Sequence, residues 1–396
     1  MAVPLLDLKP QNLPLEPELT AAFLRVLRSG HYIMGPELER FEADMARLLG
    51  VRHALGVSSG TDAILLALMA LGIGPGDEVI VPSFTFFATG GCVSRVGARP
   101  VFADACPVCF NLEVSDAARR ITPRTKAIMP VHLYGQAADL DAIGALAARH
   151  GLHLIEDGAQ ALGAKYRGRA VGGFGAFGTF SFFPSKNLGA LGDAGLLVTQ
   201  DDALAEKARL LRLHGAKPKY YHHLVGANFR MDALQAAFLS VKAARYDDYT
   251  EARRRNAADY TAQLSGLPGV VVADPARCGC VESRGGGQEA DIRMVLPVAY
   301  PHNEHIWNQY TVRVLGEGRR DALRNHLQAR GIGTEIYYPV PLHAQPCFSP
   351  AVGAAQELPV CERLAREVLS LPIYPELTAA QRSEVVLGLR DFLVAG

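Results

Sequence analysis

The sequence predicts an α/β fold in which helices cover both faces of a largely parallel sheet, followed by a smaller α+β domain. Two observations lead to this prediction. Through the first part of the 396-residue chain, short apolar runs of the strand type alternate with helical segments, a pattern that is typical of parallel βαβ units. Beyond residue 245 the pattern changes character. We therefore expect a large domain over residues 1–245 and a small domain over residues 246–396.

The first clear helix shows how the elements are assigned. Residues 36–50 place Phe41 and Met45 at helical spacing, with charged residues between them. Pro36 suits the first turn of a helix, and Gly50 suits the position after its end. Similar criteria assign strands to residues 52–57, 78–81, 99–103, 126–131, 152–156 and 179–183, and helices to residues 62–71, 85–96, 140–150, 201–213 and 231–244.

The small domain is expected to mix strands and helices without strict alternation. Its expected strands cover residues 269–273, 309–315 and 332–337, and its expected helices cover residues 247–265, 319–330, 357–369 and 378–394. The stretch at residues 278–291 is rich in glycine, serine and charge, which predicts a mobile loop. An arginine run at residues 253–255 is expected to form a solvated helix face.

The composition excludes several classes of partner. The 40 Lys and Arg residues balance the 40 Asp and Glu residues, so nothing favours nucleic acid or an anionic membrane as a partner. The first residues lack the basic segment and apolar core of a signal peptide. No apolar run approaches the roughly 18 residues that a membrane span requires. We expect a cytoplasmic protein with neither a nucleic-acid nor a membrane partner.

The seven cysteines do not form a recognisable metal motif. Cys106 and Cys109 form a CxxC pair, whereas Cys278 and Cys280 form a CxC pair far away in the sequence. Paired zinc knuckles require two pairs with suitable spacing. We therefore expect reduced thiols and no metal site.

The stretch TFSFFPSKNLGALGDAG at residues 179–195 is the one around which the chain is organised. Its single lysine, Lys186, lies between an apolar run and a stretch rich in Ala, Leu and Gly. Lysine is costly to bury, and a buried amine loses its proton readily, which allows it to attack an aldehyde. A surface lysine in a glycine loop fits this stretch alone equally well.

Two turns that follow predicted strands are candidate ligand sites. Residues 58–61, Ser-Ser-Gly-Thr, open a helix whose free first-turn amides can bind phosphate, although an ordinary N-capped turn has the same sequence. Asp157 also follows a strand, and Gln160 comes three residues later. An acid at this end of a parallel strand can pair with a protonated ring nitrogen, and a helix N-cap is the alternative.

The segment HGAKPKYYHHLVGANFR at residues 214–230 is basic, aromatic and punctuated by glycine. Its cations and rings can hold a phosphorylated or nucleotide ligand. The same segment can equally be a connection that packs on a partner subunit.

Five motifs together resemble one family. They are VPSFTF at residues 81–86, IEDGAQALGA at residues 155–164, SFFPSKNLGALGDAG at residues 181–195, GANFRMDALQAA at residues 226–237 and GIGTEIYYPVPLH at residues 331–343. The set resembles the pyridoxal-phosphate-dependent sugar aminotransferases of the DegT/DnrJ/EryC1/StrS group, and the resemblance covers nearly the whole chain. It implies fold type I, with a sheet of the seven-stranded type in the large domain.

The resemblance implies a role for each matching residue. Lys186 is similar to the lysine that forms the internal aldimine and serves as the base of the proton shift in transamination. The other matched cofactor contacts are Asp157 at the pyridinium nitrogen, Gln160 beside the ring, Gly60, Thr61 and Ser181 at the phosphate, Phe86 stacked on the ring, and Asn228 at the phosphate of the neighbouring subunit. A homodimer with shared active sites is therefore implied.

The reaction implied by the resemblance moves an amino group, with glutamate as the expected donor, to a keto-sugar linked to a nucleotide. Sugar 3-dehydratases of the same fold carry histidine in place of the lysine, so Lys186 favours transamination. A cofactor-binding regulator would need a DNA-binding module or a basic face, and the sequence has neither. Arg230, Tyr310 and residues 217–223 are the expected substrate contacts. The nucleotide (UDP, dTDP or GDP), the position of the ketone and a cyclitol acceptor stay open.

Overall fold

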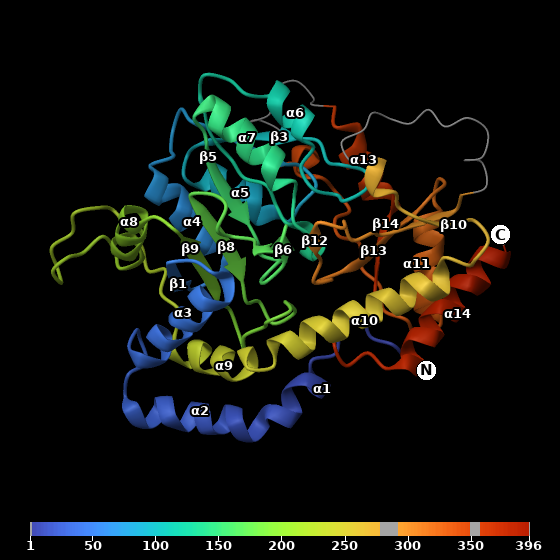
Figure 1. Cartoon of the computed structure of the whole chain (residues 1–396), viewed down its shortest axis with the longest axis horizontal. Helices are drawn as coiled ribbons and strands as arrows, with labels where there is room; N and C mark the ends of the chain where they lie inside the picture. The colour runs from blue at the N-terminus through green and yellow to red at the C-terminus, as the bar shows by residue number, and fades with distance from the viewer. Residues whose placement is uncertain (1, 278–291, 349–356, 396) are drawn as a thin grey trace.

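The computed structural model describes residues 2–277, 292–348 and 357–395. In Figure 1 the large sheet and its helices occupy one side of the molecule, and a smaller sheet with its own helices occupies the other. The stretch at residues 278–291, predicted to be a mobile loop, lies outside the described residues.

Seven strands form the large sheet in the order β1-β9-β8-β5-β4-β2-β3. Their bounds are His53–Val57 (β1), Glu78–Pro82 (β2), Arg99–Ala103 (β3), Thr125–Ile128 (β4), His153–Asp157 (β5), Phe177–Ser181 (β8) and Gly195–Thr199 (β9). In this sheet β9 runs against both of its neighbours, and the remaining pairings are parallel. The carboxyl ends of all strands but β9 therefore share one edge, where ligands bind in such folds.

Helices cover both faces of this sheet, as predicted. The helices α3 (Pro36–Leu49) and α7 (Leu140–His150) pack on the face that presents Ile80. The opposite face, which presents Val79 and Val81, is covered by α4 (Gly60–Leu71), α5 (Phe87–Arg95) and α8 (Asp202–Arg212). Successive strand residues point to opposite faces, so a strand covered on both sides is apolar throughout.

The small domain is built on a four-stranded sheet with the order β10-β11-β13-β14. Its elements are β10 (Val270–Val272), β11 (Met294–Leu296), β13 (Tyr310–Val314), β14 (Val368–Leu371), α11 (Arg319–Ala329), α13 (Pro359–Glu367) and α14 (Ala379–Ala395). The long helix α10 (Tyr246–Leu264) runs across the molecule toward this sheet (Figure 1). The division into two domains at residue 245 stays a prediction.

The remaining elements are short. They are the strands β6 (Lys165–Tyr166), β7 (Arg169–Ala170) and β12 (Asn303–Glu304) of a third sheet, the helices α1 (Lys9–Asn12) and α6 (Val114–Arg119), and 3-10 turns at Leu13–Leu15, Leu133–Gly135, Pro275–Arg277 and Leu342–Ala344. Within the described residues, none of the helices combines the length and the apolar character that crossing a bilayer requires.

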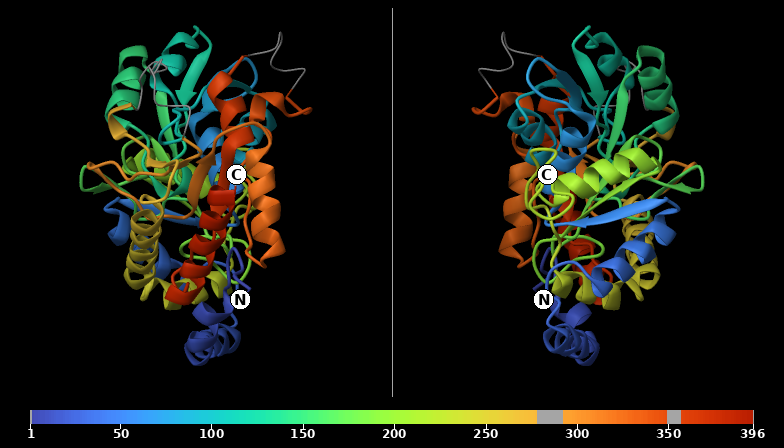
Figure 2. Two further views of the ribbon diagram at one scale, coloured as in Figure 1. Left: turned by 90° about the vertical axis from the view of Figure 1, so that its right-hand side faces the viewer. Right: turned by 90° about the vertical axis from the view of Figure 1, so that its left-hand side faces the viewer.

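A helix near the N-terminus, α2 (Glu16–Ser29), lies at one end of the molecule, as the two side views of Figure 2 show. It packs on α9 (Ala233–Ala243) through small side chains, among them Ala22 and Ala237. Small residues at the contact let two helices approach closely. No helix is predicted for these N-terminal residues from the sequence.

Pairing with distant strands explains where the predicted elements are wrong. The helix predicted at residues 357–369 ends at Glu367, because the residues from Val368 onward pair with β13 as strand β14. The strand predicted at residues 332–337 is reduced to isolated bridges at Ile332 and Glu335. Strand β9 is missing from the prediction altogether. In each case the neighbouring strand, rather than local propensity, decides the conformation.

Arg253 corrects the prediction of a solvated arginine face. Its side chain is 2% exposed, and Nη1 donates hydrogen bonds to three carbonyl oxygens, those of Trp307 at 3.1 Å, Asn308 at 3.3 Å and Ile373 at 3.0 Å. Burial lowers the pKa of Arg253 to about 10. A buried charge requires such partners, and these bonds tie α10 to the segments before β13 and after β14.

Candidate active site

The residues predicted to bind a cofactor come together at the carboxyl edge of the large sheet. Asp157 ends β5, and Ser181 ends β8. Gly60 opens α4 after β1, and Lys186 lies in the loop between β8 and β9. The parallel topology therefore gathers residues from four segments of the chain that are far apart in sequence.

The loop that carries Lys186 is folded back tightly on itself. The amide of Lys186 donates to the carbonyl of Phe183 at 2.8 Å. Gly189 is required in this loop, because a Cβ at that position would lie 2.2 Å from the carbonyl oxygen of Pro184. Gly189 therefore permits close packing of the loop backbone and does not indicate a flexible loop.

Asn187 fastens the same loop to the segment before β13. Its side-chain nitrogen donates to the backbone carbonyl of Ile306 at 2.8 Å, and its side-chain oxygen accepts from the side-chain nitrogen of Asn308 at 2.7 Å. Asn187 is 3% exposed. The position next to Lys186 is therefore held by two buried hydrogen bonds, which orient the lysine.

The amine of Lys186 is poised to lose its proton. The residue is partly buried, and burial lowers the pKa of its amine to about 8, although the negative charge of Asp157 acts in the opposite direction. Desolvation disfavours the charged form of an amine. The alternative, a surface lysine in a glycine loop, fits this partly buried side chain less well.

This pKa predicts how the protein captures an aldehyde. Only the neutral amine attacks, so we expect the rate of pyridoxal phosphate capture to rise with pH through about 8 and to level off above it. Stopped-flow absorbance of the apoprotein mixed with pyridoxal phosphate measures this rate. A midpoint near that of an ordinary lysine, above about 10, would contradict the assignment.

Asp157 is a buried carboxylate with two hydrogen-bond donors. It is 4% exposed; Oδ2 accepts from the Thr89 hydroxyl at 2.8 Å, and Oδ1 accepts from the Ala159 amide at 3.1 Å. Burial raises the pKa of Asp157, while these two donors and the charge of Lys186 lower it. No helix begins after Asp157 in this described part of the chain, so the alternative role as a helix N-cap is wrong.

Thr89 is a site residue that the sequence analysis missed. Its side chain is fully buried, and its hydroxyl also lies 3.2 Å from the hydroxyl of Thr85. When Thr89 donates to Asp157, its oxygen can accept from Thr85, which completes a directed chain of hydrogen bonds. This chain favours the ionised form of Asp157 and fixes its orientation.

The N-terminus of α4, predicted to bind phosphate, presents free backbone amides at this edge. Ser59 caps the helix, with Oγ accepting from the Asp62 amide at 3.0 Å. Among the described residues, the amides of Gly60 and Thr61 have no hydrogen-bond partner. A Cβ on Gly60 would lie 2.8 Å from the Cβ of Ser181, so the absence of a side chain brings the helix end against β8. The N-capped turn and the predicted phosphate site therefore occupy the same structure, and the two interpretations do not exclude each other.

Gln160 and Phe86 flank this site. Gln160 is 7% exposed, whereas Phe86 is 56% exposed. The side-chain oxygen of Gln160 accepts from the Tyr134 amide at 2.7 Å, and its nitrogen donates to the Tyr338 hydroxyl at 3.0 Å. The ring of Phe86 lies 6.2 Å from that of Tyr338. Tyr134 and Tyr338 are further site residues that sequence reasoning did not assign.

A comparison with protein families shows which family the chain belongs to. The sequence model of the DegT/DnrJ/EryC1/StrS aminotransferase family matches residues 15–279 and 288–390. The chain belongs to this family. The match confirms the resemblance drawn from the five motifs, and with it the predicted fold class.

Relatives in this family are similar over nearly the whole chain. The "Pleiotropic regulatory protein" of Geobacillus stearothermophilus is 47% identical over 392 residues, which is 99% of each chain. A dTDP-3-amino-3,4,6-trideoxy-alpha-D-glucose transaminase of Streptomyces venezuelae is 46% identical over 390 residues, which is 98% of this chain and 96% of that protein. The crystal structure of S. venezuelae DesV in complex with a ketimine intermediate has a TM-score of 0.90 at 45% identity, and the match covers 99% of this chain and 98% of that one.

The G-x-N-x-R segment of this family member lies beside the N-terminus of α4 in its own chain. Arg230 forms an isolated bridge with Val57, and the Ser58 amide donates to the Phe229 carbonyl at 3.1 Å. The side chain of Asn228 is exposed. Nε of Arg230 is buried and has no partner among the described residues. Oδ1 of Asn228 accepts from the Arg230 amide at 3.4 Å, and the rest of the exposed Asn228 side chain can reach a ligand or a second subunit.

Tyr310 occupies a different environment from the one predicted. Its side chain is fully buried, its hydroxyl lies 2.9 Å from the Thr261 hydroxyl, and its ring packs 5.3 Å from that of Tyr260. These contacts place Tyr310 in the core between β13 and α10, where it presents no surface to a substrate. Its predicted role as a substrate contact is therefore not retained.

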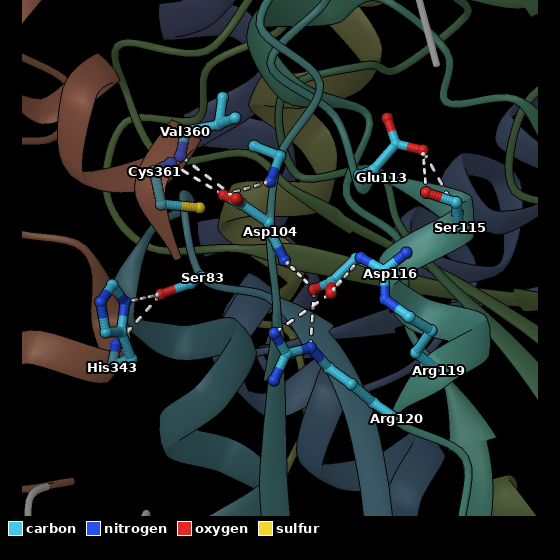
Figure 3. A network of polar contacts seen from close by, with 11 residues as sticks. Ser83, Asp104, Glu113, Ser115, Asp116, Arg119, Arg120, His343, Val360 and Cys361 are labelled. Carbon is cyan, nitrogen blue, oxygen red and sulfur yellow. Dashed lines mark hydrogen bonds and ion pairs between the residues drawn. The ribbon is translucent and has the colours of Figure 1, made fainter. Parts of the chain in front are cut away.

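A polar network joins the large domain of this aminotransferase-family chain to α13 (Figure 3). Asp104, just after β3, accepts from the amides of Val360 at 3.1 Å and Cys361 at 2.8 Å. These amides belong to the first turn of α13, where a carboxylate is favoured. The Asp104 amide in turn donates to Asp116 at 2.7 Å, which Arg120 holds at 2.6 Å.

The structure also bears on the cysteine pairs. Among residues 2–277, 292–348 and 357–395, no group of three or more His, Cys, Asp or Glu side chains is placed to hold a metal ion. Cys106 and Cys109 are both buried. Cys278 and Cys280 lie outside the described residues.

Proposed function

We propose that this protein is a pyridoxal-phosphate-dependent aminotransferase that moves an amino group from glutamate to a keto-sugar linked to a nucleotide. One arrangement carries the proposal: burial lowers the pKa of the Lys186 amine to about 8, and the charge of the buried Asp157 acts on that amine, at the same sheet edge as a helix N-terminus with two free amides. The name of the S. venezuelae relative, a dTDP-sugar transaminase, supports the reaction and the substrate class.

The residues present fit each functional group of pyridoxal phosphate. The amides of Gly60 and Thr61 and the adjacent Ser181 suit a phosphate, because a helix N-terminus attracts negative charge. Asp157 suits a protonated ring nitrogen, and Lys186 suits an aldehyde carbon. When bound, the cofactor supplies an electron sink for the carbon that carries the transferred nitrogen.

The side chains of this protein supply positioning and proton movement. Lys186, half-deprotonated near pH 8, takes up and returns a proton at its amine, as a general base requires. Asp157 would hold a protonated ring nitrogen of the bound cofactor, and Thr89 orients Asp157. The exposed ring of Phe86 offers an apolar face for stacking.

Two alternatives fit these residues less well. A sugar dehydratase of the same fold would carry histidine where this chain has Lys186. The relative in G. stearothermophilus is named a pleiotropic regulatory protein, but a regulator without turnover has no use for a desolvated amine under the influence of a buried carboxylate. The reactive lysine therefore favours transamination over both.

We also propose a homodimer. Large apolar side chains are exposed near the site and on α2, which is uncommon for a surface that stays in water. They include Phe23, Leu27, Tyr32, Ile33, Phe86, Phe87, Phe183 and Leu191. Tyr220, Tyr221 and Val225 are 67–91% exposed in the segment at residues 214–230. We propose that this segment either forms part of the same interface or contacts the nucleotide of the substrate.

We further propose that the protein is located in the cytoplasm, which cell fractionation tests.

Mixed dimers test whether Asn228 serves the neighbouring subunit. Asn228→Asp places a carboxylate beside the phosphate, which we expect to weaken cofactor binding by at least about tenfold. A dimer of one Asn228→Asp chain and one Lys186→Ala chain is expected to recover up to half of the wild-type activity, because one site then holds both native residues. Recovery of no activity would mean that Asn228 acts within its own chain or not at all.

The experiment that tests the function is a substrate screen. Protein loaded with pyridoxal phosphate is incubated with labelled glutamate nitrogen and with UDP-, dTDP- or GDP-linked keto-sugars, and the products are analysed by mass spectrometry. We expect the label to appear on one nucleotide-linked sugar. Transfer to cyclitols alone would replace the nucleotide-sugar assignment, and elimination of a hydroxyl without transfer would favour the lyase.

A further inference from the structure

Residues 305–309 form a short segment without regular secondary structure that leads directly into β13. Its first four residues are at most 8% exposed. Buried backbone outside a helix or a sheet has to find other partners for its N–H and C=O groups. None of the roles predicted from the sequence falls on this segment, so its partners show what it does.

The carbonyl oxygens of the segment accept from side chains of two other parts of the chain. That of Ile306 accepts at 2.8 Å from the side-chain nitrogen of Asn187, in the loop between β8 and β9. Those of Trp307 and Asn308 accept from Nη1 of Arg253 in α10 at 3.1 and 3.3 Å. The pKa of Arg253, about 10, keeps its guanidinium charged at physiological pH, and hydrogen bonds from a charged donor are stronger than neutral ones.

The backbone amides of the segment donate to a 3-10 turn that also carries part of the site. The Ile306 amide donates to the Gly135 carbonyl at 3.0 Å, and the Asn308 amide donates to the Tyr134 carbonyl at 2.8 Å. The Tyr134 amide in turn donates to the side-chain oxygen of Gln160 at 2.7 Å. The turn that fixes Gln160 is thereby tied to the same segment as the loop between β8 and β9.

Trp307, in the middle of the segment, has a φ of 51°, in the left-handed region that bulky residues rarely adopt. Two contacts with His305 hold it there: the Trp307 amide donates to Nδ1 of His305 at 2.9 Å, and the two rings stack with their centroids 3.9 Å apart. Burial lowers the pKa of His305 to about 3, so Nδ1 stays unprotonated and accepts at physiological pH. The Ile306 carbonyl before Trp307 and the Asn308 side chain after it both contact Asn187.

The two side-chain amides of Asn187 and Asn308 can be oriented in one way. The Ile306 carbonyl can only accept, so the nitrogen of Asn187 faces it. The oxygen of Asn187 then accepts from the nitrogen of Asn308, 2.7 Å away. Asn187 directly follows Lys186 in the chain, so this hydrogen bond acts one residue away from the reactive amine.

We propose that Asn308 is a positioning residue for Lys186. Its side-chain nitrogen holds Asn187, and Asn187 holds the backbone next to the lysine, so the amine meets its ligand from one fixed place. The segment at residues 305–309 is then a common support for the lysine and for Gln160. The inference rests on the proposed function, which makes this lysine the residue that captures the aldehyde.

Asn308→Leu tests the inference, because it removes the donor and keeps the approximate size of the side chain. The rate at which the apoprotein captures pyridoxal phosphate is measured against pH by stopped-flow absorbance. On the plateau above the midpoint the amine is neutral, so the plateau rate reports its positioning. One hydrogen bond corresponds to about a tenfold change in a rate, and we expect the plateau to fall by about that factor.

The midpoint of the same pH profile gives a second readout. It lies near the pKa of the Lys186 amine, about 8, and the charge of Asp157, which also acts on that amine, is unchanged in the variant. An amine that is held less firmly regains contact with water, so we expect the midpoint to rise by about half a pH unit or more. A residue with a merely structural role would lower the melting temperature and leave both readouts unchanged.

Asn308→Asp is the second variant, and it decides the matter if Asn308→Leu does not fold. It keeps the size and polarity of the side chain, but its ionised carboxylate cannot donate, so we expect a similar fall of the plateau rate. Gln309→Leu is the matched control. It removes the neighbouring side-chain amide, whose oxygen has no partner among the described residues, and we expect the wild-type plateau and midpoint.

Asn308→Leu should have little further effect in an Asn187→Leu background, because the two residues act through one hydrogen bond. A wild-type plateau and midpoint in folded Asn308→Leu, or a wild-type plateau in Asn308→Asp, would overturn the inference while the proposed function stands. A wild-type protein that captures no pyridoxal phosphate would overturn both.

Discussion

Lys186→Ala is expected to abolish aminotransfer and the visible absorbance, at about 400 nm, that pyridoxal phosphate acquires on the wild-type protein. A positioned proton-transfer group alone contributes about 10²- to 10⁴-fold to a rate. Lys186 is also the amine that we expect to capture the aldehyde, so turnover should fall by at least about 10³-fold. The absorbance spectrum and the rate of amino transfer from glutamate measure the two effects.

Lys242 provides the matched control for this prediction. It is 1% exposed, and burial lowers its pKa to about 8, as for Lys186. Its charge partner is Glu376 rather than Asp157. We expect Lys242→Met to keep the visible absorbance, because a lowered pKa is not sufficient without the surrounding site. Full activity in Lys186→Ala would remove the basis of the proposed mechanism.

Asp157→Asn is expected to have the second largest effect, although it keeps the shape of the side chain. The variant lacks the charge that holds a proton on the ring nitrogen. Breaking a buried charge pair costs about 3–5 kcal/mol, which corresponds to a loss of about 10²- to 10⁴-fold in kcat. Rapid-mixing measurements of the half-reaction with glutamate give this rate directly.

Thr89→Val is expected to cause a smaller loss of kcat than Asp157→Asn. It removes the 2.8 Å hydrogen bond to Asp157 and keeps the charge, so we expect a loss of about tenfold or less in kcat. Thr89→Ser should restore most of the rate, because it restores the hydroxyl. A wild-type kcat in Asp157→Asn, or a larger loss in Thr89→Val than in Asp157→Asn, would contradict the assigned roles.

Lys186, Gly60 and Asp157 could be predicted from the sequence because the residues next to each of them in the chain indicate its place in the fold. Lys186 is surrounded in sequence by the small residues that shape its loop. Gly60 lies in a strand–turn–helix segment, and the first amides of any helix have no partner within the helix. Asp157 follows an apolar run, so it has to lie at the end of a strand. These positions follow from the alternation of elements, which also fixes the common edge of the parallel strands.

Thr89 and Tyr338 could not be predicted in this way, because they are distant in the chain from the site residues that they contact. Thr89 lies 68 residues from Asp157, and Tyr338 lies 178 residues from Gln160. Neither has a local pattern that distinguishes it from a packing residue. Only the folded sheet and the segment after Tyr337 bring these hydroxyl groups to the site.

The wrong predictions have the same physical origin. Residues 368–371 continue an apolar helical pattern, yet antiparallel pairing with β13 makes them a strand. Arg253 belongs to a charged run, yet three carbonyl oxygens receive its guanidinium in the core. Tyr310 was a plausible polar contact, yet its hydroxyl meets Thr261 inside the small domain. In each case tertiary partners outweigh the local signal.

The central claim is that Lys186 and Asp157 form a site for pyridoxal phosphate that accepts an amino group. The most direct test is the absorption spectrum of the purified protein with pyridoxal phosphate, recorded before and after glutamate is added. We expect a band at about 400 nm that moves into the ultraviolet once glutamate has donated its amino group. The absence of any such band with excess pyridoxal phosphate would contradict the account.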